Sequence, residues 1–227
     1  MRLLALDTAT EGCSAALLAE GRLLTREAEL PRGHAERILP MIDELLSEAG
    51  MSLRGLDALA FGRGPGSFTG ARLAAGIAQG LAFGAGLGVV AISDLRALAQ
   101  RGLDEASGIT RVLVCNDARM QEVYWGCFER SGDGLAVDRG PERVGPPAAV
   151  ALPPSWAEAA GLGRGFAAYP MLKSLAGLVV PEAWDRLLPR AAEIARLAAP
   201  EAAAGRLLAP EAAVPVYLRD DVARPPP

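Results

Sequence analysis

Histidine and cysteine are scarce in this chain of 227 residues, which has one histidine and three cysteines. The single histidine, His34, cannot supply the paired imidazole ligands of a transition-metal site, and the cysteines lack the CxxC spacing of a zinc site. An odd number of widely spaced cysteines also forms no disulfide framework, which is typical of a reducing compartment. The sequence therefore predicts no bound metal and no cofactor.

Positive charge is not in excess either. The chain has 23 Lys and Arg residues against 27 Asp and Glu residues, so its formal net charge is −4. Domains that hold nucleic acid without help are usually basic. The composition is otherwise that of a globular protein, with 51% hydrophobic and 22% charged residues. It does not predict direct binding of nucleic acid.

The sequence predicts neither export nor insertion into a membrane. The first acid, Asp7, comes too early for a signal peptide. Residues 73–92 carry no charge and match the length of a membrane span, about 20 residues. Gly84, Gly86 and Gly88, however, are typical of a helix end followed by a turn, so this run predicts a helix, a turn and a strand. We expect a cytoplasmic protein.

Apolar periodicity predicts an α/β protein whose first hundred residues form a hairpin-led sheet completed by parallel strands. The expected elements there are strands at 3–7, 14–19, 22–29, 56–61 and 89–92 and helices at 34–49, 71–83 and 93–100. The second half is less regular, with strands at 111–115 and 121–129, turns at 116–119 and 131–134, and a helix at 190–199. We expect one lobe at 1–103 and a second at 104–227, the latter ending in a loose proline tail.

A glycine-dense turn at 62–70 (GRGPGSFTG) follows the strand at 56–61. Such a turn presents backbone N–H groups at a helix N-terminus, which suits phosphate or another anion. No Lys-Ser or Lys-Thr pair closes it, so it is not a Walker loop. The candidate vestigial nucleotide or anion loop consists of Asp7, Gly64, Gly66, Ser67 and Thr69. In the alternative interpretation, Asp7 caps a turn and Ser67 and Thr69 cap the following helix.

Two expected helices carry apolar rows that suit either a partner or the chain's own sheet. In the helix at 34–49 the row is Ile38, Ile42, Leu45 and Ala49, with Met41 beside it. In the helix at 71–83, Gly76 and Gly80 lie four residues apart, a spacing that lets another backbone come close. Each interior glycine costs about 1 kcal/mol against alanine, so this pair needs a packing reason. If the first row faces a partner, Ile42→Glu would leave the chain folded.

Ser67 is a candidate nucleophile whose surroundings do not favour that role. The sequence around it departs from the GxSxG elbow by one residue, and the single histidine is expected on a different helix. His34 is expected to line a contact at the start of its helix rather than to act as a general base. We therefore predict no catalytic residue.

Several segments together resemble the TsaB family, also called YeaZ, over nearly the whole chain. They are residues 4–10, 37–40, 62–70, 117–120 with 122–125, and 215–219. The resemblance implies an actin/Hsp70-like ATPase (ASKHA) fold, in which two lobes each have a mixed sheet flanked by helices. It also implies a degenerate active site. Ala9 stands where that fold usually has a phosphate-facing glycine, and Glu11 adds negative charge beside it.

The same resemblance implies a role as a non-catalytic scaffold for TsaD, the subunit that transfers the threonylcarbamoyl group to tRNA. The two helices would form the contact with TsaD, TsaE would join a larger complex, and the isolated chain would form a homodimer. The tRNA would be bound only indirectly. The alternative is a nucleotide-binding hydrolase or a glycoprotease-like peptidase of the same fold. The predicted partner interface is His34, Ile38, Met41, Ile42, Leu45, Leu73, Ile77, Gly80 and Leu81.

Overall fold

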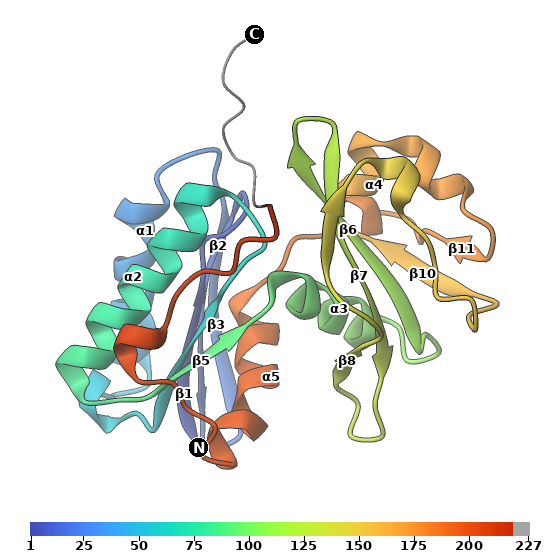
Figure 1. The fold of residues 1–227 in the computed structure, drawn as a ribbon. Helices are drawn as coiled ribbons and strands as arrows, with labels where there is room; N and C mark the ends of the chain where they lie inside the picture. Colours follow the sequence, from blue (N-terminus) through green and yellow to red (C-terminus); the bar gives the residue numbers. More distant parts are fainter. Residues whose placement is uncertain (220–227) are drawn as a thin grey trace, which may run out of the picture.

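Two mixed sheets, each covered by helices, make up the computed structural model, which describes residues 1–219 (Figure 1). This is the actin/Hsp70-like architecture that the sequence predicts. The predicted proline tail at 220–227 lies outside the described residues. No helix within residues 1–219 is long and apolar enough to cross a membrane.

The first sheet has the strand order β3-β2-β1-β4-β5. β1 (Arg2–Asp7), β2 (Gly12–Ala19) and β3 (Arg22–Glu29) are antiparallel, whereas β4 (Ala58–Gly62) and β5 (Val89–Ile92) run parallel to β1. Strands β1 and β4 are buried on both faces, which explains why they read as continuous apolar runs.

Helices cover both faces of this sheet. α1 (His34–Glu48) and α2 (Phe68–Ala85) lie on one face, over alternate residues such as Leu4, Leu6 and Leu17. α5 (Ala191–Ala203) lies on the other face, over the residues in between, such as Leu3 and Ala5. The period-two alternation of β1 thus divides its side chains between two separate cores.

The second sheet has the strand order β11-β10-β6-β7-β8, with β9 also paired to β7. Its strands are β6 (Arg111–Arg119), β7 (Glu122–Arg130), β8 (Ala136–Asp138), β9 (Arg143–Gly145), β10 (Ala159–Leu162) and β11 (Leu178–Val179). α3 (Asp94–Glu105) covers one face, and α4 (Gly165–Ala168) with the surrounding loops covers the other. The remaining elements are the 3-10 helices η1 (Leu53–Gly55), η2 (Pro147–Ala149), η3 (Pro170–Ser174), η4 (Trp184–Arg186) and η5 (Pro210–Ala212).

Packing crosses the predicted lobe boundary in both directions. α3 lies almost wholly within the predicted first lobe but packs on the second sheet. α5 lies within the predicted second lobe but packs on the first sheet. The two helices also pack against each other between the sheets (Figure 1). Each lobe in space therefore combines segments from both sides of residue 103. The division of the chain into 1–103 and 104–227 stays a prediction.

The structure differs from the local expectations at one turn and at several element ends, among them α5, which runs beyond the predicted end at residue 199 to Ala203. The predicted turn at 116–119 is wrong, because β6 continues to Arg119 and the reversal occurs at Met120 and Gln121, with positive φ from Arg119 to Gln121. α2 begins at Phe68 rather than near residue 71, and Ser67 is its N-cap through a 3.0 Å bond from the Gly70 N–H. Thr69 therefore lies inside the helix and does not cap it. α3 extends to Glu105, beyond the predicted end at residue 100.

Candidate functional site

The apolar row of α1 is core rather than surface. Ile38, Met41 and Leu45 are fully buried and Ile42 is 4% exposed, all within the core beneath α1 and α2. A side chain that is buried in its own chain cannot contact a partner, so the prediction that these four residues form the interface is wrong. A helix that covers a sheet shows the same 3.6-residue period as one that binds a partner, which is why the sequence could not separate the two.

The outer face of α2 is open and carries its glycines. A side-chain carbon added at Gly76, Gly80 or Gly84 would meet no atom within 4 Å. The chain's own sheet therefore does not account for these glycines. The inner face of the helix consists mainly of alanines, which pack on β4 and its neighbours. Phe83, close to Gly80 and Gly84 in the helix, has 82% of its surface exposed.

The remaining predicted interface residues lie at the edges of these two helices. Ile77 and Leu81 are partly buried and pack against the core, and Leu73 is also half-buried. His34, the first residue of α1, is half-buried, and its Nε2 atom is enclosed without a hydrogen-bond partner. Leu39, which the prediction did not include, is 48% exposed on α1.

An aromatic cluster at the start of α2 was not predicted from the helical pattern. The Arg72 guanidinium carbon lies 3.5 Å from the centre of the Phe68 ring, and the rings of Phe68 and Tyr217 are 5.7 Å apart. Phe68 and Tyr217 are each about half exposed, at 49% and 47%. The segment around Tyr217, which the sequence marked only through its family resemblance, therefore extends the open surface of α2.

The glycine turn packs against the first turn of the chain. A Cβ at Gly66 would lie 2.9 Å from the Cβ of Ala9, and a Cβ at Gly70 would be 3.0 Å from the carbonyl carbon of Thr8. The Ser67 N–H donates to the Ala9 carbonyl over 2.7 Å. These glycines allow two backbone segments to approach closely.

Three N–H groups of this turn, those of Gly64, Ser67 and Gly70, are already used within the chain. The Gly64 N–H donates to Asp94 Oδ2 over 2.5 Å, the Gly70 N–H donates to Ser67 Oγ, and the Ser67 N–H is bonded as described above. An anion bound by these three groups would have to break these bonds. The alternative interpretation of the turn, in which Ser67 is a helix cap, is the one that the geometry supports.

Two acids meet behind the glycine turn. Asp7 at the end of β1 and Asp94 at the start of α3 are both fully buried. The Ala9 N–H donates to Asp7 Oδ1 over 2.8 Å. Burial raises the pKa of Asp7 to about 6, and burial together with the charge of Asp7 raises the pKa of Asp94 well above its ordinary value. Sequence reasoning missed Asp94, which follows the predicted cap Ser93.

Ion pairs join the first turn of the chain to residues of its second half. Glu11 lies 3.1 Å from Arg119 of the β6–β7 hairpin and 3.5 Å from Arg164, which follows β10. Arg119 also pairs with Asp117 over 3.0 Å. The Glu11 carboxylate, which the sequence analysis placed beside any phosphate, is thus bound by two arginines, one from β6 and one from the loop between β10 and α4.

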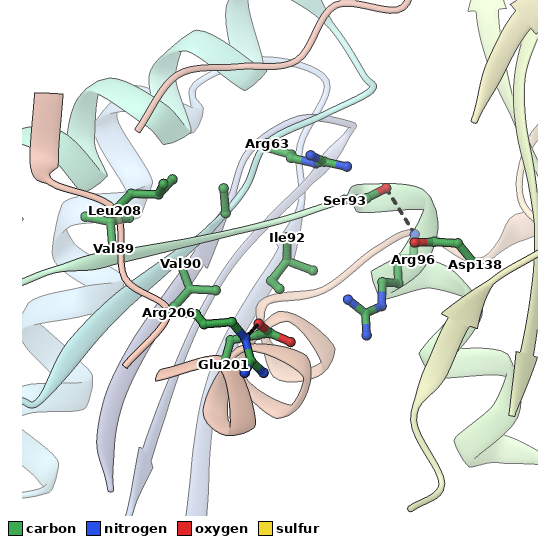
Figure 2. A pocket seen from close by; sticks show the side chains of 11 residues that line it. Arg63, Val89, Val90, Ile92, Ser93, Arg96, Asp138, Glu201, Arg206 and Leu208 are labelled. Atoms are coloured by element: carbon green, nitrogen blue, oxygen red, sulfur yellow. Dashed lines mark hydrogen bonds and ion pairs between the residues drawn. The ribbon is translucent and has the colours of Figure 1, made fainter. Parts of the chain in front are cut away.

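A cavity of about 360 Å³ lies beside β5 (Figure 2). Arg63, Arg96 and Arg206 line it together with Glu201. Arg206 pairs with Glu201 over 2.5 Å, and Arg96 Nε donates to the Ala136 carbonyl. Within residues 1–219 no group of three or more His, Cys, Asp or Glu side chains is placed to hold a metal ion.

Comparisons with known proteins agree with one another. A family model described as TsaD: tRNA N6-adenosine threonylcarbamoyltransferase matches residues 28–176. The tRNA threonylcarbamoyladenosine biosynthesis protein TsaB of Escherichia coli (strain K12) is 44% identical over 228 residues, which cover 98% of this chain and 96% of that protein. The protein of the same name from Haemophilus influenzae is 42% identical, with coverage of 98% and 95%.

A solved structure has the same fold throughout. It is described as YeaZ from Pseudomonas aeruginosa and superposes with a TM-score of 0.88 at 47% sequence identity. The match covers 96% of this chain and 99% of that one. The similarity therefore includes both sheets and is not confined to the glycine turn.

Proposed function

The chain belongs to the TsaB family, and we propose that it acts in tRNA threonylcarbamoyladenosine biosynthesis as a non-catalytic subunit that binds TsaD. In this proposal TsaD performs the transfer, and this chain supports it as a scaffold. TsaE joins the pair in a larger complex. The chain remains in the cytoplasm, as the sequence predicts, and contacts tRNA only through its partners.

The open face of α2 is the observation that carries the proposal. Three interior glycines at a spacing of four residues face no atom of their own chain, although each costs about 1 kcal/mol of helix stability against alanine. A helix of a partner that approaches this face closely would explain why glycine stands there. The exposed Phe83 and Phe68 at its two ends, 82% and 49% exposed, supply apolar area for such a contact.

The kind of partner follows from the comparison with TsaD. The matched residues 28–176 include α1 and α2, so a TsaD subunit is expected to present a similar pair of helices. Two such pairs can pack face to face. A second copy of this chain offers the same surface, so a homodimer and the TsaD complex would compete for one face.

The first turn and the glycine turn support the non-catalytic part of the proposal. Catalysis at a phosphate needs N–H donors that are free to receive developing charge. Here the Ser67 N–H is bonded to Ala9, and Glu11 is bound by Arg119 and Arg164. The alternative of a peptidase gains no support, because Ser67 Oγ accepts a hydrogen bond as a helix cap.

The experiment that tests the proposal is a titration of purified TsaD with wild-type chain, Gly80→Ala and Gly80→Leu, followed by light scattering. Since a side chain at Gly80 meets nothing in the chain, both variants should fold and melt at or above the wild-type temperature. We expect Gly80→Leu to weaken the complex at least 100-fold and Gly80→Ala to weaken it much less. A stoichiometric complex of TsaD with Gly80→Leu at micromolar concentration would exclude this face as the interface.

A further inference from the structure

Asp7 and Asp94 are buried where the end of β1 meets the start of α3. Asp7 ends β1 of the first sheet, and Asp94 begins α3, which packs on the second sheet. A hydrogen bond between their carboxyl groups lowers the pKa of Asp7 and raises that of Asp94. A side-chain carbon at Gly62 would collide with oxygens of both, so the two carboxyl groups meet against the bare backbone at the end of β4.

Each carboxyl group has one oxygen bonded and one oxygen without a donor. Asp7 Oδ1 accepts from the Ala9 N–H and Asp94 Oδ2 accepts from the Gly64 N–H. Asp7 Oδ2 and Asp94 Oδ1 are buried and have no partner, and within residues 1–219 no arginine or lysine forms an ion pair with either residue. Two buried carboxylates in contact cannot both be ionised without a large cost in free energy.

We infer that Asp7 and Asp94 share one proton, and that this proton fixes the end of β1, the glycine turn at 62–64 and the start of α3 to one another. With the proton present, one carboxyl group donates to the other and the two unpartnered oxygens are satisfied. Without it, two carboxylates repel each other at the junction of the two sheets. The junction is then weakened, and α3 is released from β1.

The charged and titratable groups around the pair leave the pKa values of both acids raised. From α1, His34 acts on Asp7 and lowers its pKa, but burial has the larger effect and keeps that pKa raised, at about 6. From β2, Cys13 adds no charge near neutral pH, because burial raises the pKa of its thiol to about 11. From the loop after β8, Glu142 raises the pKa of Asp94 further.

Glu142 is itself part of the same junction. It accepts a hydrogen bond from Ser93 Oγ and lies 3.9 Å from Arg63. Burial raises its pKa, while the hydrogen bond and the charges of Arg63 and Arg96 lower it. These two arginines act on Glu142 and are not paired with Asp7 or Asp94, so they do not replace the shared proton.

The sign of the pH dependence follows from the raised pKa values. The folded chain binds this proton more tightly than the unfolded chain, so the free energy of unfolding falls as pH rises from the ordinary aspartate value, about 4, to above 6. Asp94→Asn keeps an acceptor for the Gly64 N–H and supplies a permanent donor to Asp7. It therefore imitates the protonated pair at every pH.

The test is thermal unfolding of the full chain between pH 5 and pH 8 for wild type, Asp94→Asn and the exposed control Asp43→Asn. We expect Asp94→Asn to melt about 5 °C above wild type at pH 8 and to show no such gain at pH 5. Asp43→Asn should follow wild type throughout. Amide hydrogen exchange at Gly62 and Gly64, corrected for its intrinsic pH dependence, should accelerate with rising pH in wild type alone.

Two results would overturn the inference. One is a difference between wild type and Asp94→Asn that stays constant from pH 5 to pH 8, or carboxyl ¹³C resonances of Asp7 and Asp94 that both titrate below pH 4. The other is a melting temperature at pH 8 that rises with Mg²⁺ or K⁺ in wild type but not in Asp94→Asn, which would place a cation between the acids. Should Asp94→Asn fail to fold, Asp7→Asn offers the same comparison.

Discussion

Arg72 and Tyr217, which are 145 residues apart in the chain, are joined by a 2.7 Å hydrogen bond from Arg72 Nε to the Tyr217 hydroxyl. Two further bonds hold the same segment to the first lobe: Gln79 Nε2 donates to the Ala213 carbonyl, and the Val216 N–H donates to the Arg63 carbonyl. The segment therefore lies along α2 beside its open face. It belongs to the surface that we propose for the partner.

Tyr217→Ala is expected to weaken the complex with TsaD more than it weakens the fold. Because Tyr217 is 47% exposed, its loss should cost no more than about 1 kcal/mol of stability. An aromatic side chain in the contact would cost about 2 kcal/mol or more in binding. Calorimetric titration of TsaD gives the affinity. Tyr217→Phe, which keeps the ring but not the hydroxyl, is the control, and equal affinity of all three chains would remove this segment from the interface.

Ile42→Glu should unfold the chain. The side chain is 4% exposed and belongs to the core beneath α1, so the variant loses packing and buries a carboxylate, at a combined cost of about 4 kcal/mol or more. This is the opposite of what an interface role for Ile42 implies. Circular dichroism and urea unfolding provide the measurement. Leu39→Glu, on the exposed side of α1, is the matched control and should stay folded.

Two Gly→Ala substitutions should have opposite effects on stability. Gly76→Ala meets no atom within 4 Å and should stabilise the chain by up to about 1 kcal/mol through helix propensity. Gly66→Ala would bring a methyl group within 2.9 Å of the Ala9 Cβ and should cost about 1–3 kcal/mol. For a chain of this size the melting temperatures should shift by about 2–4 °C per kcal/mol, upward for Gly76→Ala and downward for Gly66→Ala. Shifts of the same sign would show that packing does not distinguish the two positions.

Much of the fold was predictable because its signals are local. The apolar runs of β1 and β4, the helical row of α1 and the caps Ser67 and Ser93 each depend on residues within one element. The exchange of α3 and α5 between the sheets was not predictable, since each helix has an apolar face that fits either sheet. The hairpin at Arg119 to Gln121 was missed because none of its positive-φ residues is glycine.

The candidate site was less predictable for a related reason. The sequence pattern of a glycine turn is the same whether its glycines face a ligand or another part of the backbone. Gly64 and Gly66 were candidates for a ligand-binding loop, but in the structure they lie against backbone. Asp94 follows a serine cap, a position where acids are common in any helix. Only the approach of β1 and α3 in space shows that it meets Asp7.

The isolated chain is expected to hydrolyse neither ATP nor peptides and to transfer no threonylcarbamoyl group. The N–H groups of Gly64, Ser67 and Gly70 are bonded within the chain, and preorganised free donors are the main source of catalysis at a phosphate. With a net charge of −4, the chain should also retain tRNA only when its partners are present. Phosphate release, peptide cleavage and filter binding of tRNA measure the three properties. Ser67→Ala serves as the control, because a contaminating enzyme would be unaffected by it. Multiple turnover by wild type that disappears in a folded Ser67→Ala variant would show an active centre at this turn and overturn the scaffold role.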